Sequence, residues 1–452
     1  MLPLTVLGRI VIGGVAAFGL AALGLCGCGE PSTHAHRPRT VALAEAPETP
    51  RVTPPPRPPP PPAPGPGLIS LRIALAKQMR LAGPQSGAAV YDLTKQMELY
   101  SLRARVARPP ASVEKLYTTV AALLELGPGA RLHTTVLGAG HLGPGGVWHG
   151  DLYLHGGGDP TFGDGGFNRT WNHGYGPTAA QVVGQLQRRG IRRVTGQVIG
   201  DASLFDDRPG GPATGYAPDT PDYEGELGAL VYDHGSTNGK LSPGAFSARQ
   251  FAETMSGAGI QVQAASRTRR TPAHAHVLAS VSSPPLSVLL QLMDVPSDDL
   301  FADMLDEQLG ARFGTAGSIS AGAHVMSQQI ATYYDVHPSI VDGSGLSRAD
   351  RSSPDEIVKL LRLLWHTPVG DVLHDSLPVV GKTGTVTTIA DGTAAQGRCV
   401  AKTGTLNNVT NLAGYCHSRG GHTLAFALLI DGPSNWQALP LLGQMAATIA
   451  RY

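Results

Sequence analysis

Ser112-Val-Glu-Lys-Leu-Tyr-Thr-Thr-Val-Ala-Ala-Leu-Leu124 is the segment around which the rest of the chain can be organised. Its apolar residues recur at helical spacing, and Gly127 supplies a stop signal. Ser112 and Lys115 are three positions apart, so we expect both side chains on one helix face, one turn apart. A serine becomes nucleophilic when a neighbouring base, such as a buried lysine, takes its proton. Taken alone, the pair also fits a capping serine beside a surface lysine.

The triplet Lys-Thr-Gly occurs twice, at Lys382-Thr-Gly384 and at Lys402-Thr-Gly404. Gly381 gives the first copy a superficial likeness to a phosphate loop, but such a loop needs glycine where Ser376 stands. The second copy lies in Cys399-Val-Ala-Lys-Thr-Gly-Thr-Leu406, which has the pattern of a strand leading into another strand. We therefore favour Lys402 over Lys382 as the functional lysine.

A serine triplet lies between these motifs, and two segments compete for that place. Ser297-Asp-Asp299 follows Pro296 and begins the helical pattern of residues 300–305, a setting that can hold a serine rigidly toward a cleft. Ser236-Thr-Asn238 matches Ser-x-Asn literally, but Asn238-Gly239 is a hairpin-turn signal that explains it without catalysis. We favour Ser297, and we expect Asp298 to be an ordinary exposed residue of the turn.

In this order the three motifs resemble those of the serine enzymes that react with penicillin. From Leu68 to Tyr452 the chain resembles the D-alanyl-D-alanine carboxypeptidase/endopeptidase group of low-molecular-mass penicillin-binding proteins, which have a large insert between the first two motifs. The stretches that carry the resemblance beyond the serine motifs are Gly150–Pro160, Gly200–Phe205, Asp342–Arg348 and Lys402–Leu406.

The resemblance implies an α+β fold. A penicillin-binding/β-lactamase-like domain, with a five-stranded antiparallel sheet covered by helices and a helical subdomain, is interrupted by a mostly β accessory region. The expected organisation is a signal peptide or membrane or lipid anchor (1–28), a Pro-rich linker (29–67), the first part of the transpeptidase-like domain (68–160), the inserted accessory domains (161–280) and the second part of the transpeptidase-like domain (281–452).

The resemblance also implies roles for individual residues. Ser112 is the nucleophile and Lys115 its general base, while Ser297 relays a proton to the leaving D-alanine. Lys402 and Thr403 bind the terminal carboxylate of the substrate, and the backbone N–H groups of Ser112 and Thr405 form the oxyanion hole. The substrate-binding residues are then Thr403, Gly404 and Thr405. Peptidoglycan stem peptides and β-lactam antibiotics are the expected partners, with no metal or cofactor. The 16 histidines form no ligand-spaced cluster.

Asp299 departs from the family pattern, which has asparagine at this position. The asparagine amide donates to a substrate carbonyl and helps to orient the first-motif lysine, whereas a carboxylate only accepts hydrogen bonds. Asp299 would repel that carbonyl and hold Lys115 in its charged form, unless its side chain turns away. Three functions follow: an active carboxypeptidase/endopeptidase working through an acyl-enzyme, a weak or inactive homologue that binds peptidoglycan or an envelope partner, and a β-lactamase or esterase.

The N-terminal sequence predicts export to the periplasm or cell envelope. After Arg9, residues 10–29 are uncharged and apolar, which is typical of a signal peptide or a membrane anchor. Cys28 stands where a lipoprotein would carry its lipid, and the proline-rich run at 54–62 predicts a stiff extended spacer. We expect membrane contact only through this segment. A net charge of +1 gives no reason to expect a nucleic-acid partner.

Two further cysteines, Cys399 and Cys416, flank a pair of strand patterns with Asn407-Asn408 between them. If the hairpin turns at the two asparagines, the cysteines face each other across it. A cross-strand disulfide is then expected in an oxidising compartment, with two unpaired buried thiols as the alternative.

Overall fold

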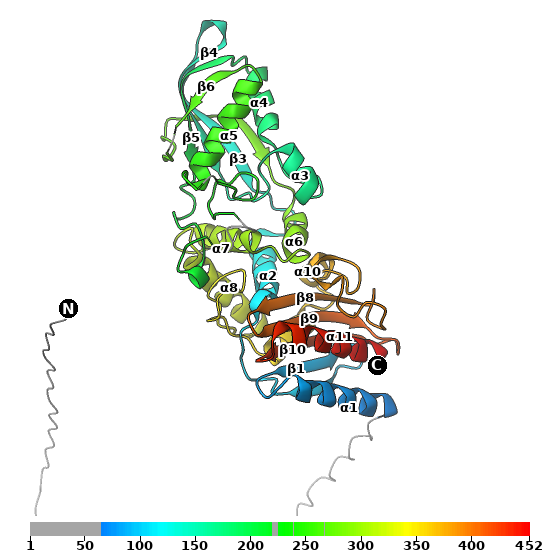
Figure 1. Cartoon of the computed structure of the whole chain (residues 1–452). Helices are drawn as coiled ribbons and strands as arrows, with labels where there is room; N and C mark the ends of the chain where they lie inside the picture. The colour runs from blue at the N-terminus through cyan, green and yellow to red at the C-terminus, as the bar shows by residue number, and fades with distance from the viewer. Residues whose placement is uncertain (1–64, 219–224, 238, 266) are drawn as a thin grey trace, which may run out of the picture. The chain divides into compact units, whose positions relative to one another are not determined.

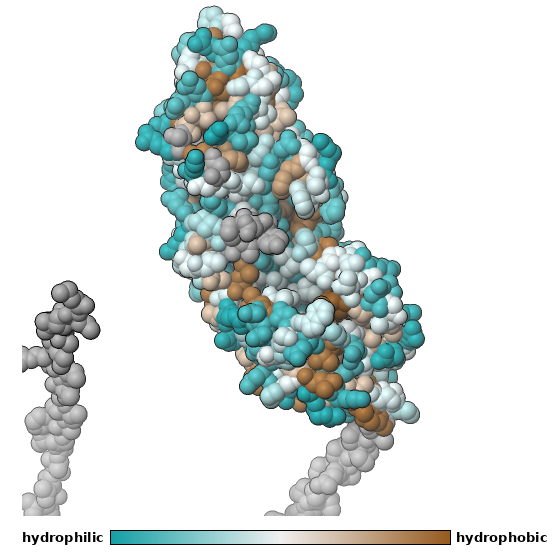
Figure 2. All heavy atoms as spheres, in the orientation of Figure 1, coloured by the Kyte–Doolittle hydropathy of each residue, from teal (hydrophilic) through white to brown (hydrophobic). Residues whose placement is uncertain are grey.

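The computed structural model describes residues 65–218, 225–237, 239–265 and 267–452 (Figure 1). The expectations for Cys28, the N-terminal apolar segment and the proline run lie outside these residues. The described residues belong to one compact unit, which contains two five-stranded sheets. No helix in the described part of the chain is long and apolar enough to cross a bilayer. On the face drawn in Figure 2, hydrophobic residues form separate patches among hydrophilic ones.

The first sheet has the strand order β2-β1-β10-β9-β8 and is antiparallel throughout. Because β1 pairs directly with β10, this sheet joins an early segment of the folded part to a late one. Its strands are β1 (Gly87–Asp92), β2 (Met97–Leu102), β8 (Cys399–Leu406), β9 (Val409–His417) and β10 (Thr423–Asp431). The five-stranded antiparallel sheet that the family resemblance implies is confirmed.

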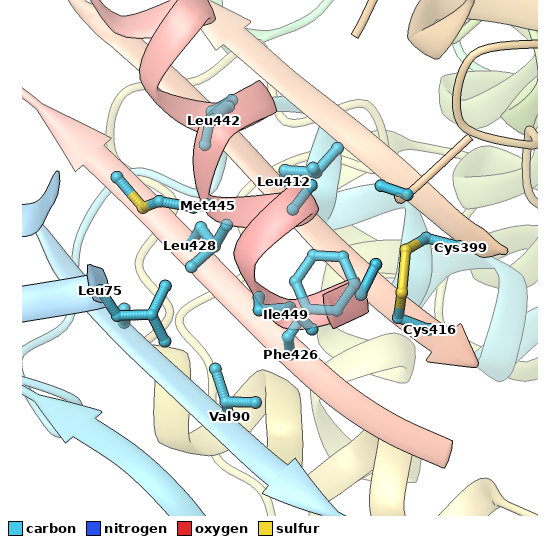
Figure 3. Close-up of a cluster of buried hydrophobic side chains, with 14 of the residues drawn as sticks. Leu75, Val90, Cys399, Leu412, Cys416, Phe426, Leu428, Leu442, Met445 and Ile449 are labelled. Atoms are coloured by element: carbon cyan, nitrogen blue, oxygen red, sulfur yellow. A yellow bond between two sulfur atoms is a disulfide. The ribbon is translucent and has the colours of Figure 1, made fainter. Parts of the chain in front are cut away.

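Helices cover both faces of this sheet, and β10 shows why. Its residues alternate between two cores, as the two-residue period of a strand requires. Phe426 and Leu428 face α1 (Pro66–Leu81) and α11 (Asn435–Arg451), where they pack with residues such as Met445 (Figure 3). The intervening Ala425, Ala427 and Leu429 belong to the core with α2 (Lys115–Leu126) and α9 (Pro354–Leu364).

The remaining helices of this part surround α2, which is buried over most of its length. They are α6 (Leu286–Asp294), α7 (Asp299–Phe313), α8 (Ile319–Tyr334) and α10 (Pro368–Ser376), with the short turns η1 (Ala111–Glu114) and η4 (Gly384–Val386). The helix expected after Ser112 is confirmed, and Gly127 ends it with a φ of 79°.

The second sheet has the order β6-β5-β4-β3-β7 and mixes parallel with antiparallel pairs. Helices accompany its strands, so this accessory region is not built of strands alone. Its elements are β3 (His133–Leu142), η2 (Pro144–Gly146), β4 (Val147–Gly156), α3 (Gly165–Trp171), α4 (Ala179–Arg188), β5 (Arg193–Asp201), η3 (Pro212–Thr214), α5 (Pro243–Gly257), β6 (Gln261–Ala264) and β7 (His276–Ser282). The sheet takes in β3 and β4, which precede the range 161–280 expected for the insert.

The hairpin of β8 and β9 turns at Asn407-Asn408, as predicted, and Asn408 adopts a φ of 59°. This register places Cys399 opposite Cys416, and the two form a disulfide (Figure 3). The predicted cross-strand bond is therefore confirmed. It ties the strand that carries Lys402 to its neighbour.

Candidate active site

Ser112 lies in the η1 turn directly before α2, and Lys115 is the first residue of that helix. The Lys115 Nζ atom donates to Ser112 Oγ at 3.2 Å and to the Ser344 carbonyl at 2.8 Å. The lysine side chain is fully buried, so its amine is aimed at the serine by its surroundings. This arrangement rules out the surface-lysine alternative considered for this pair.

Strand β8 passes very close to the turn that carries Ser112. A Cβ atom on Gly404 would lie 2.3 Å from the Pro110 carbonyl oxygen, so this position requires glycine. The Asn411 amide, on the neighbouring strand β9, donates to the carbonyls of Pro109 (3.0 Å) and Pro110 (2.9 Å). These contacts fix the nucleophile's turn against the strand of Lys402. Sequence reasoning missed Asn411, which lacks a motif of its own.

Lys402 is buried, and its Nζ donates to Ser297 Oγ at 2.7 Å. Burial, and next the positive charge of Lys115, lower the pKa of Lys402 to about 7, although Asp294 and Asp299 oppose the shift. Thr403 Oγ1 forms a 2.7 Å hydrogen bond with Thr385 Oγ1. The structure therefore brings the second and third motifs together beside the first.

Asp299 turns into the site, and its carboxylate forms an ion pair with Lys115. The side chain of Asp299 is 13% exposed and that of Lys115 is fully buried, so water weakens this pair only slightly. The alternative in which Asp299 turns away is wrong. Lys115 thus lies between its serine partner and a negative charge.

Asp298 was expected to be an ordinary exposed residue, and this expectation is wrong. Its Oδ1 accepts from the Phe301 N–H at 2.9 Å and caps the start of α7. Its Oδ2 lies 2.6 Å from His234 Nε2, and both side chains are only 16% exposed. The orphan N–H groups at a helix start need such a partner, which draws Asp298 inward.

A layer of buried acids surrounds Lys115. Asp342 organises the turn that presents the Ser344 carbonyl, because its carboxylate accepts from the N–H groups of Gly345 (2.6 Å) and Ser347 (2.8 Å). Burial raises the pKa of Glu114 well above its usual value, and the nearby Asp350 and Asp342 raise it further. Burial therefore favours the neutral form of Glu114, although the positive charge of Lys115 opposes this shift.

The rejected candidates lie in other segments of the chain. Lys382 is exposed on the loop before η4, while Ser236 and Thr237 belong to a turn of the accessory region. Asn238 lies outside the described residues. Among the residues that the structure describes, no group of three or more His, Cys, Asp or Glu side chains is arranged to hold a metal ion.

Comparison with known proteins fits this geometry. The model of the D-Ala-D-Ala carboxypeptidase 3 (S13) family matches residues 69–246 and 241–452. Carboxypeptidase DacB of Mycolicibacterium smegmatis is 30% identical over 397 residues, which is 82% of each chain. D-alanyl-D-alanine carboxypeptidase of Actinomadura sp. is 28% identical over 84% of each chain.

The fold also matches solved structures. Penicillin binding protein 4 (dacB) from Haemophilus influenzae superposes with a TM-score of 0.70 at 18% identity, covering 84% of this chain and 99% of that chain. The same protein has been solved in complex with a β-lactam. The chain therefore belongs to the D-Ala-D-Ala carboxypeptidase 3 (S13) family of serine-type D-Ala-D-Ala carboxypeptidases.

Proposed function

We propose that this chain cleaves the terminal D-alanine from peptidoglycan stem peptides through an acyl-enzyme on Ser112. The observation that carries the proposal is the pair of lysine–serine contacts that meet in one site. Lys115 Nζ lies 3.2 Å from Ser112 Oγ, and Lys402 Nζ lies 2.7 Å from Ser297 Oγ. The first pair supplies a nucleophile with its base, and the second supplies a hydroxyl through which a proton can pass.

In the first step, Ser112 Oγ attacks the carbonyl carbon of the penultimate D-alanine, and its proton passes to Lys115 Nζ. The carbonyl oxygen gains negative charge, which the backbone N–H groups of Ser112 and Thr405 stabilise. Collapse of this intermediate breaks the peptide bond, and the leaving amine receives a proton through Ser297. Water then attacks the ester and releases Ser112 with its proton restored.

Lys402 and Thr403 bind the terminal carboxylate of the substrate. A cation with a pKa of about 7 is well suited to this role, because an arriving carboxylate stabilises its charged form. Gly404 lets this strand approach the nucleophile's turn, so a substrate carboxylate held by Lys402 and Thr403 is kept beside Ser112.

Asp299 reduces the rate of this reaction. Its ion pair with Lys115 stabilises the protonated amine, which cannot act as a base, and the position lacks the amide donor of the family asparagine. The same observation favours a second candidate function, a weak homologue that binds peptidoglycan without efficient turnover. We further propose that β-lactams acylate Ser112, and that the protein is exported and held at the envelope by its N-terminal segment.

One experiment tests the proposals on acyl transfer and on β-lactam acylation together. Purified protein is incubated with a fluorescent penicillin, and D-alanine release is measured from a stem pentapeptide ending in D-Ala-D-Ala. We expect slow, stable labelling and slow D-alanine release, both lost in Ser112→Ala. Binding to peptidoglycan without labelling or release would support the second candidate instead. Rapid turnover of the penicillin would contradict both and indicate a β-lactamase.

A further inference from the structure

We propose that His234, a residue of the accessory region, is a positioning residue of the active site that acts through Asp298. The proposal rests on the proposed acyl-transfer function and concerns how that site is held in shape. The accessory region, whose sequence interrupts the domain that carries the active site, thereby helps to complete that site.

The segment before His234 is built to connect the two parts of the molecule. Its side chains alternate between two hydrophobic cores. Leu230 and Tyr232 pack in the core of the second sheet, whereas Leu227, Ala229 and Val231 pack against Leu300 and Met304 of α7. One face of this segment therefore belongs to the accessory region and the other to the helix that begins at the active site.

The turn that follows is held in a demanding conformation. Asp233, His234 and Gly235 are consecutive residues with left-handed backbones, at φ values of 48°, 60° and 68°. Non-glycine residues seldom adopt this conformation, and where they do, it often serves a function. The turn is braced, since Asp233 Oδ1 accepts from the Asp164 N–H at 2.6 Å and the Glu226 N–H donates to the Gly235 carbonyl at 2.9 Å.

This conformation points the His234 ring at the start of α7. Its Nε2 lies 2.6 Å from Asp298 Oδ2, and the ring centre lies 5.7 Å from that of Phe301. Asp298 uses its other oxygen, Oδ1, to cap the helix, so both oxygens of its carboxylate are held by hydrogen bonds. A charge-assisted hydrogen bond with little exposure to water is among the stronger polar contacts available.

Asp298 lies between the two residues whose orientation the site needs most. Ser297, with a φ of 70°, receives the hydrogen bond from Lys402, and Asp299 pairs with Lys115. A left-handed serine keeps that conformation only if its neighbours hold it. By fixing Asp298, His234 fixes the residues on either side of it.

The test compares His234→Ala with His234→Gln, whose side-chain amide keeps a donor near the Nε2 position. We expect His234→Ala to lower the turnover number for D-alanine release at least ~10-fold, with KM changed less than ~3-fold, because Thr403 is untouched. His234→Gln should recover most of this loss. The control is His337→Gln, which alters an exposed His–Asp pair at the end of α8 and should behave as wild type.

A second measurement separates this inference from the proposed function. Amide hydrogen exchange is followed in the peptide covering residues 297–301, which needs no catalytic activity. We expect exchange there to be at least ~10-fold faster in His234→Ala and near wild type in His234→Gln. Unchanged exchange in His234→Ala would overturn the inference even in an inactive enzyme, and so would equal effects of the two variants. Failure of the wild type to label with penicillin would count only against the proposed function.

Discussion

Replacing Asp299 with asparagine should accelerate acylation of Ser112. The substitution keeps the size of the side chain, removes the negative charge beside Lys115 and supplies the missing amide donor. At an effective dielectric constant of ~20, unit charges ~4 Å apart attract by ~4 kcal/mol. The 13% exposure of Asp299 reduces this attraction. If ~2 kcal/mol remains, the neutral form of the Lys115 amine is ~30-fold less populated than it would be without the Asp299 charge.

The amide donor adds a separate gain, since removal of one oxyanion-type donor costs ~10²–10³ in rate in other enzymes. We therefore expect the second-order rate constant of acylation by fluorescent penicillin to rise at least ~30-fold in Asp299→Asn. Asp335→Asn, which alters an exposed carboxylate at the end of α8, is the control. An unchanged or slower rate in a folded Asp299→Asn variant would refute the view that Asp299 restrains Lys115.

Three further outcomes are expected. Because Lys402 loses its charge above a pKa of about 7, KM for the peptide should rise as the pH passes that value; a KM that stays flat would contradict its carboxylate-binding role. Replacing Cys399 and Cys416 with serine should lower the free energy of unfolding by ~3 kcal/mol in urea titrations, since the bond closes a 17-residue separation. Burial and Asp342 raise the pKa of Asp350 to about 8 from 3.8, so the stability that it contributes is complete below pH 3.8 and is lost as the pH rises toward 8. The melting temperature should fall over this range, and less steeply in Asp350→Asn.

The sequence was most informative where the physical signal is local. Helical spacing after Ser112 predicted α2, and the position of Asn407-Asn408 predicted both the hairpin and the pairing of Cys399 with Cys416. These features depend on residues that are close in the chain, where the period of side chains or the symmetry of a turn leaves few alternatives.

The contacts that complete the site lie beyond such reasoning. His234 and Asp298 are 64 positions apart, and Asn411 reaches Pro110 across 301 positions. Asp298 was misjudged because its position before a helix also fits an exposed turn residue. The hairpin signal at Asn238-Gly239 drew attention to the wrong end of this segment, since the contact with α7 is made by His234, a few residues earlier.

The order of strands in the first sheet has a consequence for biosynthesis. Its middle strand, β10, is made almost last, yet it lies between β1 and β9 and must pair with both. A ribosome that has translated Ser112 and Lys115 still has to produce some three hundred residues before Lys402 on β8 exists. The sheet therefore closes, and the site forms, only after nearly the whole chain has emerged.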